Sequence, residues 1–145
     1  MDGRDERSDV AEIEGLVRAF LAAFVSGPDA GRRLDALPAL FVPGAVVVRT
    51  CGALQVDDVA GFVAPRRELL ASGRLEDFRE WHVEGRTDVF GDVAQHWCTY
   101  AKSWRENGSP RSGRGHKSVQ LVRTPDGWRI TAVAWDDERE PAADG

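Results

Sequence analysis

The first part of the chain alternates apolar and polar positions with the period of a helix. Apolar residues recur at spacings of three and four and predict an amphipathic helix over residues 9–25. Asp9 is its expected N-cap, and Gly27-Pro28 is expected to end it. The apolar face would consist of Ile13, Leu16, Val17, Phe20, Leu21 and Phe24.

Shorter elements follow this helix. A second helix is expected around residues 30–41, where Pro38 can restart a turn, and a β-branched run predicts a strand over residues 45–49. Residues 54–56 would be a short hairpin partner of that strand. A third helix, capped by Asp57 or Asp58, would then be kinked or divided at Pro65.

The chain after residue 76 reads as β structure. Tight turns separate four long runs, which are residues 77–90, 93–106, 114–124 and 128–138. Turns this short require antiparallel neighbours, so the pattern predicts an antiparallel meander whose apolar face the first helix covers. Helices followed by such a meander are typical of the α+β class.

A single domain is expected over residues 9–138. The length of 145 residues suits one domain with its own core. Residues 1–8 are interpreted as a disordered leader and residues 139–145 as a disordered tail.

Composition excludes several classes of function. The net charge of −5 argues against a nucleic-acid partner, and no apolar run is long enough to cross a membrane. The charged N-terminus does not resemble a secretory signal, so we expect a cytoplasmic protein. Cys51 and Cys98 match no metal-binding spacing, so no metal and no cofactor are predicted, and both cysteines are expected to be buried.

Several segments together resemble the NTF2-like superfamily, also called the SnoaL-like or cystatin-like fold, over residues 9–138. They are Phe20–Phe24, Leu37–Val48, Arg114–Leu121, Asp126–Ile130 and Trp135–Glu138. The resemblance implies a cone, in which a strongly curved antiparallel sheet wraps around the long N-terminal helix and leaves an internal pocket. It also implies a homodimer through the outer face of the sheet. The superfamily includes isomerases, dehydratases, cyclases, epoxide hydrolases and non-catalytic modules, so the fold alone does not decide function.

The ketosteroid isomerases of this superfamily use an aspartate as general base and two hydrogen-bond donors. Aligned by hand, the donor positions hold Phe20 and Val119, and the base position holds Arg49. Phenylalanine and valine cannot donate a hydrogen bond, and arginine stays protonated. Isomerase chemistry of that design is therefore not expected, and the Asp-Arg-Asp pattern of the epoxide hydrolases is not recognisable either.

Three residues remain as candidates for acid–base chemistry, namely His82, Tyr100 and His116. His82 has Glu80 and Glu84 two positions away, which would orient an imidazole and raise its pKa. The alternative for His82 is a solvated strand face. Tyr100, the single tyrosine of the chain, could donate to a ligand carbonyl or belong to the core.

Ligand-binding candidates come from the strands and from the aromatic residues. Ser118 and Gln120 alternate with Lys117, Val119 and Leu121, and either face into the pocket or lie on the outer face at a dimer interface. Arg49 would clamp an acidic or carbonyl-rich ligand, or else pair with a carboxylate such as Asp136 or Glu80. The remaining expected contacts are the aromatic side chains Phe20, Phe24, Trp81, Trp97, Trp104 and Trp135.

Two functions remain open. The first is a cofactor-independent acid–base enzyme of the cyclase, dehydratase or isomerase type that acts on an apolar carbonyl-containing molecule. The second is a non-catalytic ligand-binding or dimerisation module. A small-molecule ligand and a homodimer are the expected partners in either case.

Overall fold

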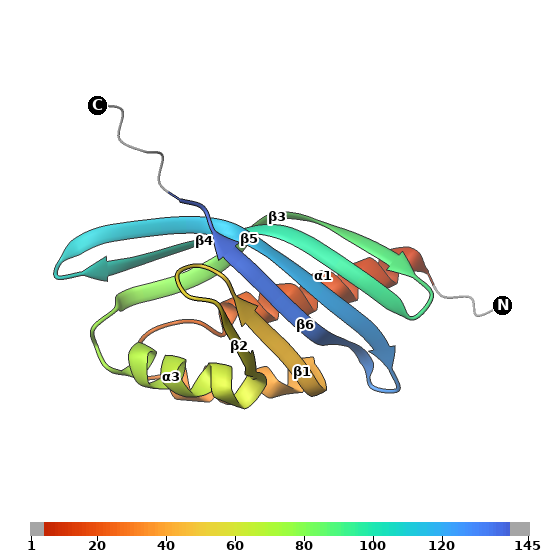
Figure 1. The fold of residues 1–145 in the computed structure, drawn as a ribbon, viewed down its shortest axis with the longest axis horizontal. Helices are drawn as coiled ribbons and strands as arrows, with labels where there is room; N and C mark the ends of the chain where they lie inside the picture. Colours follow the sequence, from red (N-terminus) through yellow and green to blue (C-terminus); the bar gives the residue numbers. More distant parts are fainter. Residues whose placement is uncertain (1–4, 140–145) are drawn as a thin grey trace, which may run out of the picture.

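The computed structural model describes residues 5–139, which form a six-stranded sheet with helices packed against it (Figure 1). The helices are α1 (Glu6–Ala22), α2 (Ala30–Asp35) and α3 (Val59–Ala71), with a 3₁₀ turn at Leu37–Leu40. The strands are β1 (Phe41–Arg49), β2 (Gln55–Asp58), β3 (Glu76–Phe90), β4 (Val93–Glu106), β5 (Ser109–Thr124) and β6 (Gly127–Asp137). None of the helices within this part of the chain has the length and apolar character of a membrane span.

The sheet is curved and unclosed, with strand order β2-β1-β6-β5-β4-β3. The predicted meander is confirmed, because β3 to β6 pair antiparallel in chain order. β5 begins at Ser109, earlier than predicted, since Asn107 and Gly108 take positive φ angles of 52° and 78° and form a tight hairpin. β1 pairs with β6 in parallel, so the sheet is mixed rather than wholly antiparallel.

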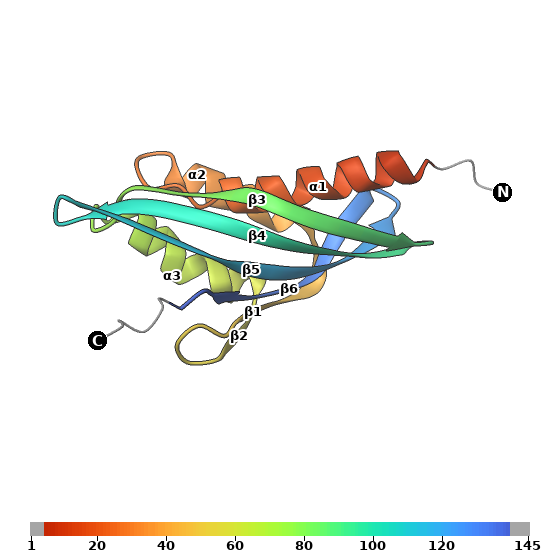
Figure 2. The same cartoon turned by 90° about the horizontal axis from the view of Figure 1, so that it is seen from above.

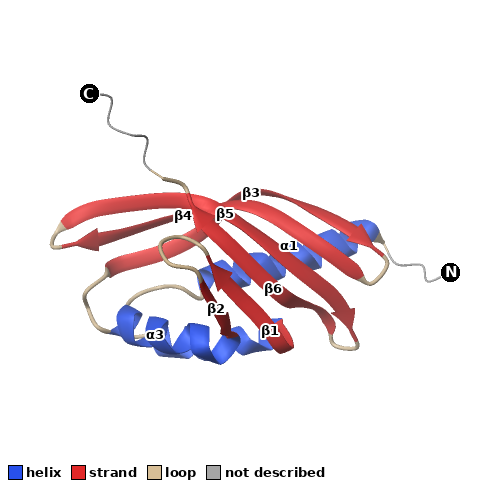
Figure 3. Cartoon of the chain, viewed as in Figure 1, coloured by secondary structure: helices blue, strands red, loops and turns tan. Residues whose placement is uncertain are grey.

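Helix α1 lies along one face of the sheet, as Figure 2 shows from above. Its buried face is the predicted one, with Ile13, Val17, Phe20 and Leu21 almost completely enclosed. Helix α3 lies at the end of the sheet formed by β1 and β2, with the strands in red and the helices in blue in Figure 3. The core fills the space between the concave face of the sheet and these helices.

Helix α1 begins earlier than predicted. Asp5 is its N-cap and accepts a hydrogen bond from the backbone N–H of Arg7 at 2.9 Å. The predicted cap at Asp9 is therefore wrong, and residues 6–8, interpreted as leader, are helical. The rest of the predicted leader and most of the predicted tail, residues 1–4 and 140–145, lie outside the described residues.

The other two helical predictions are partly correct. The segment 30–41 contains α2 and the 3₁₀ turn, with Pro38 inside the turn. Helix α3 begins at the predicted cap, because the carboxylate of Asp58 accepts from the backbone N–H of Gly61 at 2.7 Å. Pro65 does not divide this helix, which is continuous from Val59 to Ala71.

Candidate functional site

A cavity of about 350 Å³ lies between α1, α3 and the concave face of the sheet. This volume is in the range of small-molecule sites. Apolar and aromatic side chains form one part of its wall, namely Phe20, Phe24, Phe62, Pro65, Leu69, Leu70, Leu75, Phe78 and Trp135. Its polar and thiol groups are Arg49, Cys51, Gln55, Arg66, Glu80, Lys102, Lys117 and Asp137.

One row of paired residues crosses all six strands beside this cavity. From β3 to β2 the row is Gly85, Cys98, Lys117, Trp135, Arg49 and Gln55. Its last four members line the cavity. The strand pairing therefore places a lysine and an arginine on either side of Trp135, on the same face of the sheet.

Lys117 is the most unusual polar residue of the cavity. Its side chain is buried, with only 2% of its surface exposed. Its ammonium lies 4.1 Å from the ring centre of Tyr100, 4.0 Å from that of Trp135 and 5.5 Å from that of Phe20. Within residues 5–139 no carboxylate lies within 4.0 Å of this ammonium, so aromatic faces stand in for an ion-pair partner. Burial lowers the pKa of Lys117 to about 8.

Glu80 is the acidic counterpart of this lysine. It pairs across the strands with Lys102 and also lines the cavity. Burial raises the pKa of Glu80, although the positive charges of Lys117 and Lys102 act in the opposite direction. The cavity thus holds a lysine and a carboxyl group whose ionisation is altered by the same enclosed environment.

Tyr100, Lys102 and Asp137 form a hydrogen-bonded group at the sheet side of the cavity. The Tyr100 hydroxyl donates to Oδ1 of Asp137, and Nζ of Lys102 donates to Oδ2 at 2.9 Å. Tyr100 and Asp137 both pair with Gly115 of the strand between them, which has no side chain to separate them. Burial would raise the pKa of Asp137, but the bonds from Tyr100 and Lys102 outweigh it and lower the pKa. Burial and the bond to Asp137 raise the pKa of the Tyr100 hydroxyl.

Two guanidinium groups complete the polar lining. Arg49 donates through Nε to the sulfur of Cys51 at 3.2 Å. Arg66 stacks on the Phe62 ring, with its guanidinium carbon 3.8 Å from the ring centre, and donates to the Phe62 carbonyl at 3.1 Å. Burial, and then the charge of Arg49, lower the pKa of Arg66. The two cations are close enough to repel each other, an arrangement that favours an anionic group between them.

The structure places four of the predicted ligand-binding residues at this cavity. Phe20, Phe24, Arg49 and Trp135 all line it. Tyr100 is not part of the cavity lining, but its hydroxyl donates a hydrogen bond to Asp137, which is. His82 lies elsewhere on the inner face, with its Nε2 atom 3.0 Å from Nε2 of His96.

The other predicted residues lie on the outer face of the sheet. Ser118 and Gln120 point away from the cavity because their neighbours Lys117, Val119 and Leu121 are buried on the inner face. His116 also lies outside and hydrogen-bonds to Glu138 at 3.1 Å.

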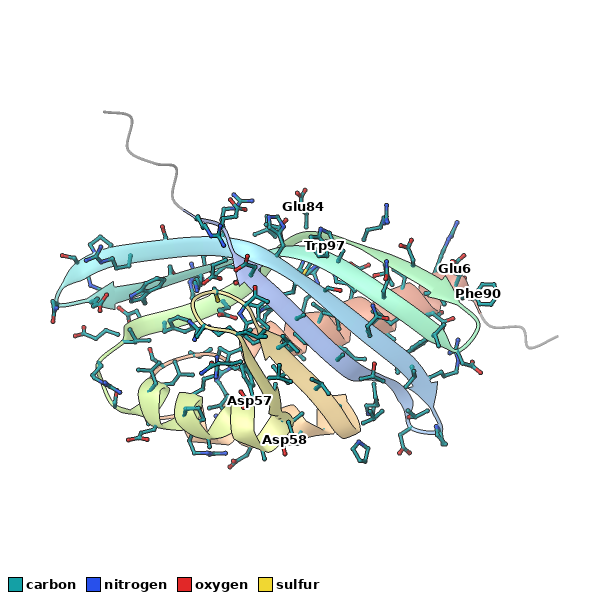
Figure 4. The ribbon with its side chains drawn as sticks, in the orientation of Figure 1. Glu6, Asp57, Asp58, Glu84, Phe90 and Trp97 are labelled. Carbon is teal, nitrogen blue, oxygen red and sulfur yellow. The ribbon has the colours of Figure 1, made fainter. Side chains whose placement is uncertain are left out.

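Trp97, another predicted ligand contact, shares this outer face. It is 54% exposed and stacks on His116 with ring centres 5.8 Å apart. Figure 4 shows Trp97 and Glu84 on β4 and β3, away from α3. Of the two remaining predicted aromatic contacts, Trp81 is 38% exposed, and Trp104 packs against Phe78.

Lys117, Glu80, Lys102 and Asp137 were not among the predicted site residues. Lys117 shares its side of β5 with Val119 and Leu121, and these apolar neighbours are the sequence signal that could have identified an enclosed amine. Glu80 could have been recognised only as a carboxylate on the same side of β3 as Phe78. Nothing in the sequence indicated that Asp137 would meet Tyr100, because that contact depends on pairing across three strands.

No protein-family model and no curated protein matches the sequence. Similar solved structures include a candidate aromatic ring hydroxylase from Novosphingobium aromaticivorans, with 18% identity, 94% of each chain covered and a TM-score of 0.74. A candidate dehydratase of the NTF2-like family from Streptomyces avermitilis has 18% identity and a TM-score of 0.71, with 94% of this chain and 100% of that chain covered.

An NTF2-like protein with a cystatin-like fold, also from Novosphingobium aromaticivorans, has 22% identity and a TM-score of 0.68. That alignment covers 95% of this chain and 90% of the other. Likeness at such identities concerns the backbone and leaves the chemistry of the site open. The chain therefore has the NTF2-like, cystatin-like fold.

Proposed function

We propose that the cavity binds a small, mostly apolar carbonyl compound and that Lys117 and Glu80 catalyse proton transfer at the carbon beside the carbonyl. The observation that carries this proposal is the enclosed ammonium of Lys117, which has aromatic neighbours and no ion-pair partner among the described residues. A buried cation without a counter-ion is unfavourable in a purely structural role. Such a cation is well suited to stabilising negative charge that develops on a substrate.

The two groups have complementary roles. With a pKa of about 8, Lys117 is mostly protonated at neutral pH and can donate to the carbonyl oxygen. The ionised carboxylate of Glu80 takes the proton from the α-carbon, and the C–H electron pair forms the carbon–carbon double bond of an enolate. The raised pKa of Glu80 makes it a stronger base than an exposed glutamate. Return of the proton to another carbon, or loss of a leaving group, gives isomerase or dehydratase chemistry without a cofactor.

The rest of the cavity supports a cyclic or aromatic substrate that carries an acidic group. Phe20, Phe62 and Trp135 provide flat apolar surfaces, and Arg49 and Arg66 provide two positive charges. Two of the similar structures are candidates for aromatic ring hydroxylation and for dehydration. Those assignments concern the other proteins, but both reactions involve compact cyclic or oxygenated molecules that a cavity of this size would admit.

Exchange of α-protons for deuterium tests the chemistry without knowledge of the natural substrate. The protein is incubated in deuterium oxide with 2-tetralone or cyclohexanone, and loss of the α-proton signal is followed by NMR. We expect exchange above the buffer rate, proportional to protein concentration. Glu80→Gln should slow it by about 10²–10⁴-fold, and Lys117→Met by about 10²–10³-fold.

Substitutions on the outer face are the controls. Ser118→Ala and His116→Gln should leave the exchange rate unchanged, because both side chains lie on the opposite face of the sheet from the cavity. If Glu80→Gln and Lys117→Met exchange as fast as the unsubstituted protein, the catalytic assignment is wrong. A ketone that binds, as seen by quenching of tryptophan fluorescence, without any exchange would support the non-catalytic binding module instead.

We also infer that the chain forms a homodimer through the outer face of the sheet and acts in the cytoplasm. Exposed aromatic side chains on that face include Trp81 and Trp97, which are 38% and 54% exposed. Large exposed aromatic groups are typical of interface centres. Two unpaired cysteines fit a reducing compartment.

Sedimentation velocity tests the dimer. The unsubstituted protein should sediment as a dimer and Trp97→Asp as a monomer. Leu54→Asp, at an exposed position just before β2, is the control that should stay dimeric.

A further inference from the structure

Three potential metal ligands meet on the inner face of the sheet, outside the cavity. They are His82 on β3 and His96 and Cys98 on β4. One ligand atom from each residue lies within 4.8 Å of the other two. His96 and Cys98 are buried, with 1% and 0% of their surface exposed. These are two of the three histidines and one of the two cysteines of the whole chain.

The two imidazoles face each other in a way that protein contacts alone do not satisfy. Nε2 of His82 and Nε2 of His96 are 3.0 Å apart, so in the neutral pair only one of them can carry a proton toward the other. Nδ1 of His82 is buried and, among the described residues, has no hydrogen-bond partner. Two lone-pair nitrogens at such a separation are suited to bind one cation between them.

Gly85 provides the space in which the three ligands meet. A Cβ at this position would lie 2.6 Å from Nε2 of His96, 2.9 Å from Nε2 of His82 and 2.9 Å from Cβ of Cys98. Any other residue would therefore separate the ligands. The bulge of β3 between His82 and Glu84 brings His82 and Gly85 onto the same side of the sheet, although an odd number of positions separates them.

Thr87 holds His96 in the orientation that a metal ligand needs. Its hydroxyl oxygen lies 2.6 Å from Nδ1 of His96. With the Nδ1–H donating to this oxygen, Nε2 is left with a free lone pair that points at His82. A hydrogen bond to the far nitrogen is the usual support of a metal-binding histidine.

We propose that His82, His96 and Cys98 bind a Zn²⁺ ion through the two Nε2 atoms and the thiolate sulfur. In a tetrahedral zinc site, ligand atoms are about 3.3–3.8 Å apart. The longest separation in the cluster, at most 4.8 Å, would therefore shorten by up to about 1–1.5 Å, and the 3.0 Å between the two Nε2 atoms would lengthen slightly. Two nitrogens and one sulfur suit zinc better than magnesium or calcium, which prefer oxygen. Water or a protein oxygen would take the fourth position.

The burial of the cluster indicates a structural ion. Closed, buried sites stabilise folds, whereas catalytic zinc keeps an open position toward a substrate pocket. None of the three ligands lines the cavity. Cys98 is nevertheless the direct cross-strand neighbour of Lys117, so an ion here would link β3 to β4, the strand next to the one that carries the proposed catalytic lysine. This inference does not depend on the proposed function.

Cobalt substitution tests the site by spectroscopy. The chelator-treated, reduced protein is titrated with Co²⁺, and we expect one equivalent to produce tetrahedral visible bands and a thiolate-to-cobalt charge-transfer band in the near ultraviolet. Competition with a chromophoric chelator then gives the Zn²⁺ affinity. Cys98→Ser should abolish the charge-transfer band, and His96→Gln should weaken Zn²⁺ binding by at least about 100-fold.

The chain offers a matched control for each ligand type. Cys51→Ser and His116→Gln remove the remaining cysteine and histidine, which lie outside the cluster, and should leave both the spectrum and the affinity unchanged. Thr87→Val should weaken binding by about 10–100-fold through loss of the orienting hydrogen bond. X-ray absorption at the zinc edge of the unsubstituted protein should show one sulfur and two imidazoles, a result that needs no variant to fold.

Three outcomes would overturn the proposal. They are the absence of a stoichiometric Co²⁺ or Zn²⁺ complex at micromolar metal, a zinc-edge spectrum without sulfur, and equal loss of binding in Cys51→Ser or His116→Gln.

Discussion

Arg123 on β5 donates hydrogen bonds to both carboxylate oxygens of Asp9 on α1, with Nη1 2.8 Å from Oδ1 and Nη2 2.9 Å from Oδ2. The indole N–H of the fully buried Trp128 donates to the same Oδ1 at 3.1 Å. The first turns of α1 are thus joined to β5 and β6 by one carboxylate. This explains why Asp9, expected to cap the helix, is 8% exposed and faces the sheet.

Asp9→Ala should therefore destabilise the fold strongly. The substitution removes the acceptor of the Trp128 N–H and the bidentate partner of Arg123, which keeps only its bonds to Asp92 and to the Gly91 carbonyl, and a buried donor without a partner is unfavourable. We expect the melting temperature, measured by circular dichroism, to fall by roughly 5–10 °C. Asp88→Ala is the matched control, because Asp88 belongs to an exposed pair with Arg86 and should change the melting temperature little. Equal effects of the two substitutions would contradict this account.

Lys117→Met should raise the unfolding free energy at neutral pH and remove part of the pH dependence of this free energy. In the folded state the pKa of Lys117 falls from 10.5 to about 8, so between these pH values the unfolded chain binds more protons than the folded one. Stability from this residue is therefore low below pH 8 and rises toward pH 10.5. The full rise in unfolding free energy from this residue across that pH range is roughly 3 kcal/mol.

Urea unfolding across this pH range measures the effect. The unfolding free energy of Lys117→Met should exceed that of the unsubstituted protein at pH 7, and the gap should close as the pH rises. Comparing the two proteins at each pH cancels the titration of other groups. A gap that stays constant with pH would show that Lys117 is not the buried cation described above.

The fold could be predicted because it depends on patterns that the sequence shows directly. The apolar face that includes Ile13 and Phe20, the turns after the long β runs and the capping Asp58 are local signals, and each produced the expected element. The predicted division at Pro65 is wrong, because α3 continues through this residue from Val59 to Ala71. The parallel pairing of β1 with β6 is a long-range event without a local signal.

The site could be predicted only in part because strand alternation does not say which face is enclosed. Ser118 and Lys117 lie on opposite sides of β5, and the sequence left open which of them faces inward. The apolar neighbours Val119 and Leu121 favoured the inner side for Lys117, against the ordinary expectation that lysine is exposed. The bulge after His82 changes the side of every later residue on β3, which alternation cannot reveal.

Tyr100→Phe should lower the unfolding free energy by an amount that depends on pH. The phenol hydroxyl and Lys102 both donate to Asp137 and keep its pKa low, so this contribution is present at neutral pH and is lost as the pH falls through the lowered pKa. We expect a loss of about 1–3 kcal/mol at pH 7 that shrinks below about pH 4. Urea unfolding at a series of pH values measures it, and a loss independent of pH would contradict a role through Asp137.

The same tyrosine provides a direct optical check. Tyr100 is the single tyrosine of the chain, so phenolate absorbance reports this residue alone. Because burial and the bond to Asp137 raise the pKa of its hydroxyl, the folded protein should show no phenolate signal in alkaline solution until it unfolds. Ionisation at the pH of free tyrosine, with the far-ultraviolet spectrum unchanged, would show that the hydroxyl is accessible.

Gly115→Ala should disrupt the group around Asp137, whereas Gly113→Ala on the same strand should not. A Cβ at Gly115 would lie 2.4 Å from the Asp136 carbonyl oxygen, 2.7 Å from the Tyr100 hydroxyl and 2.9 Å from Cα of Asp137, so the backbone of β6 would have to move. At Gly113 the nearest atom is Cε of the flexible Lys102 side chain, at 3.1 Å. We expect a loss of about 1–3 kcal/mol for Gly115→Ala and less than about 0.5 kcal/mol for Gly113→Ala in urea unfolding at pH 7. Comparable losses at both positions would mean that the missing side chain at Gly115 is not what lets Tyr100 reach Asp137 across β5.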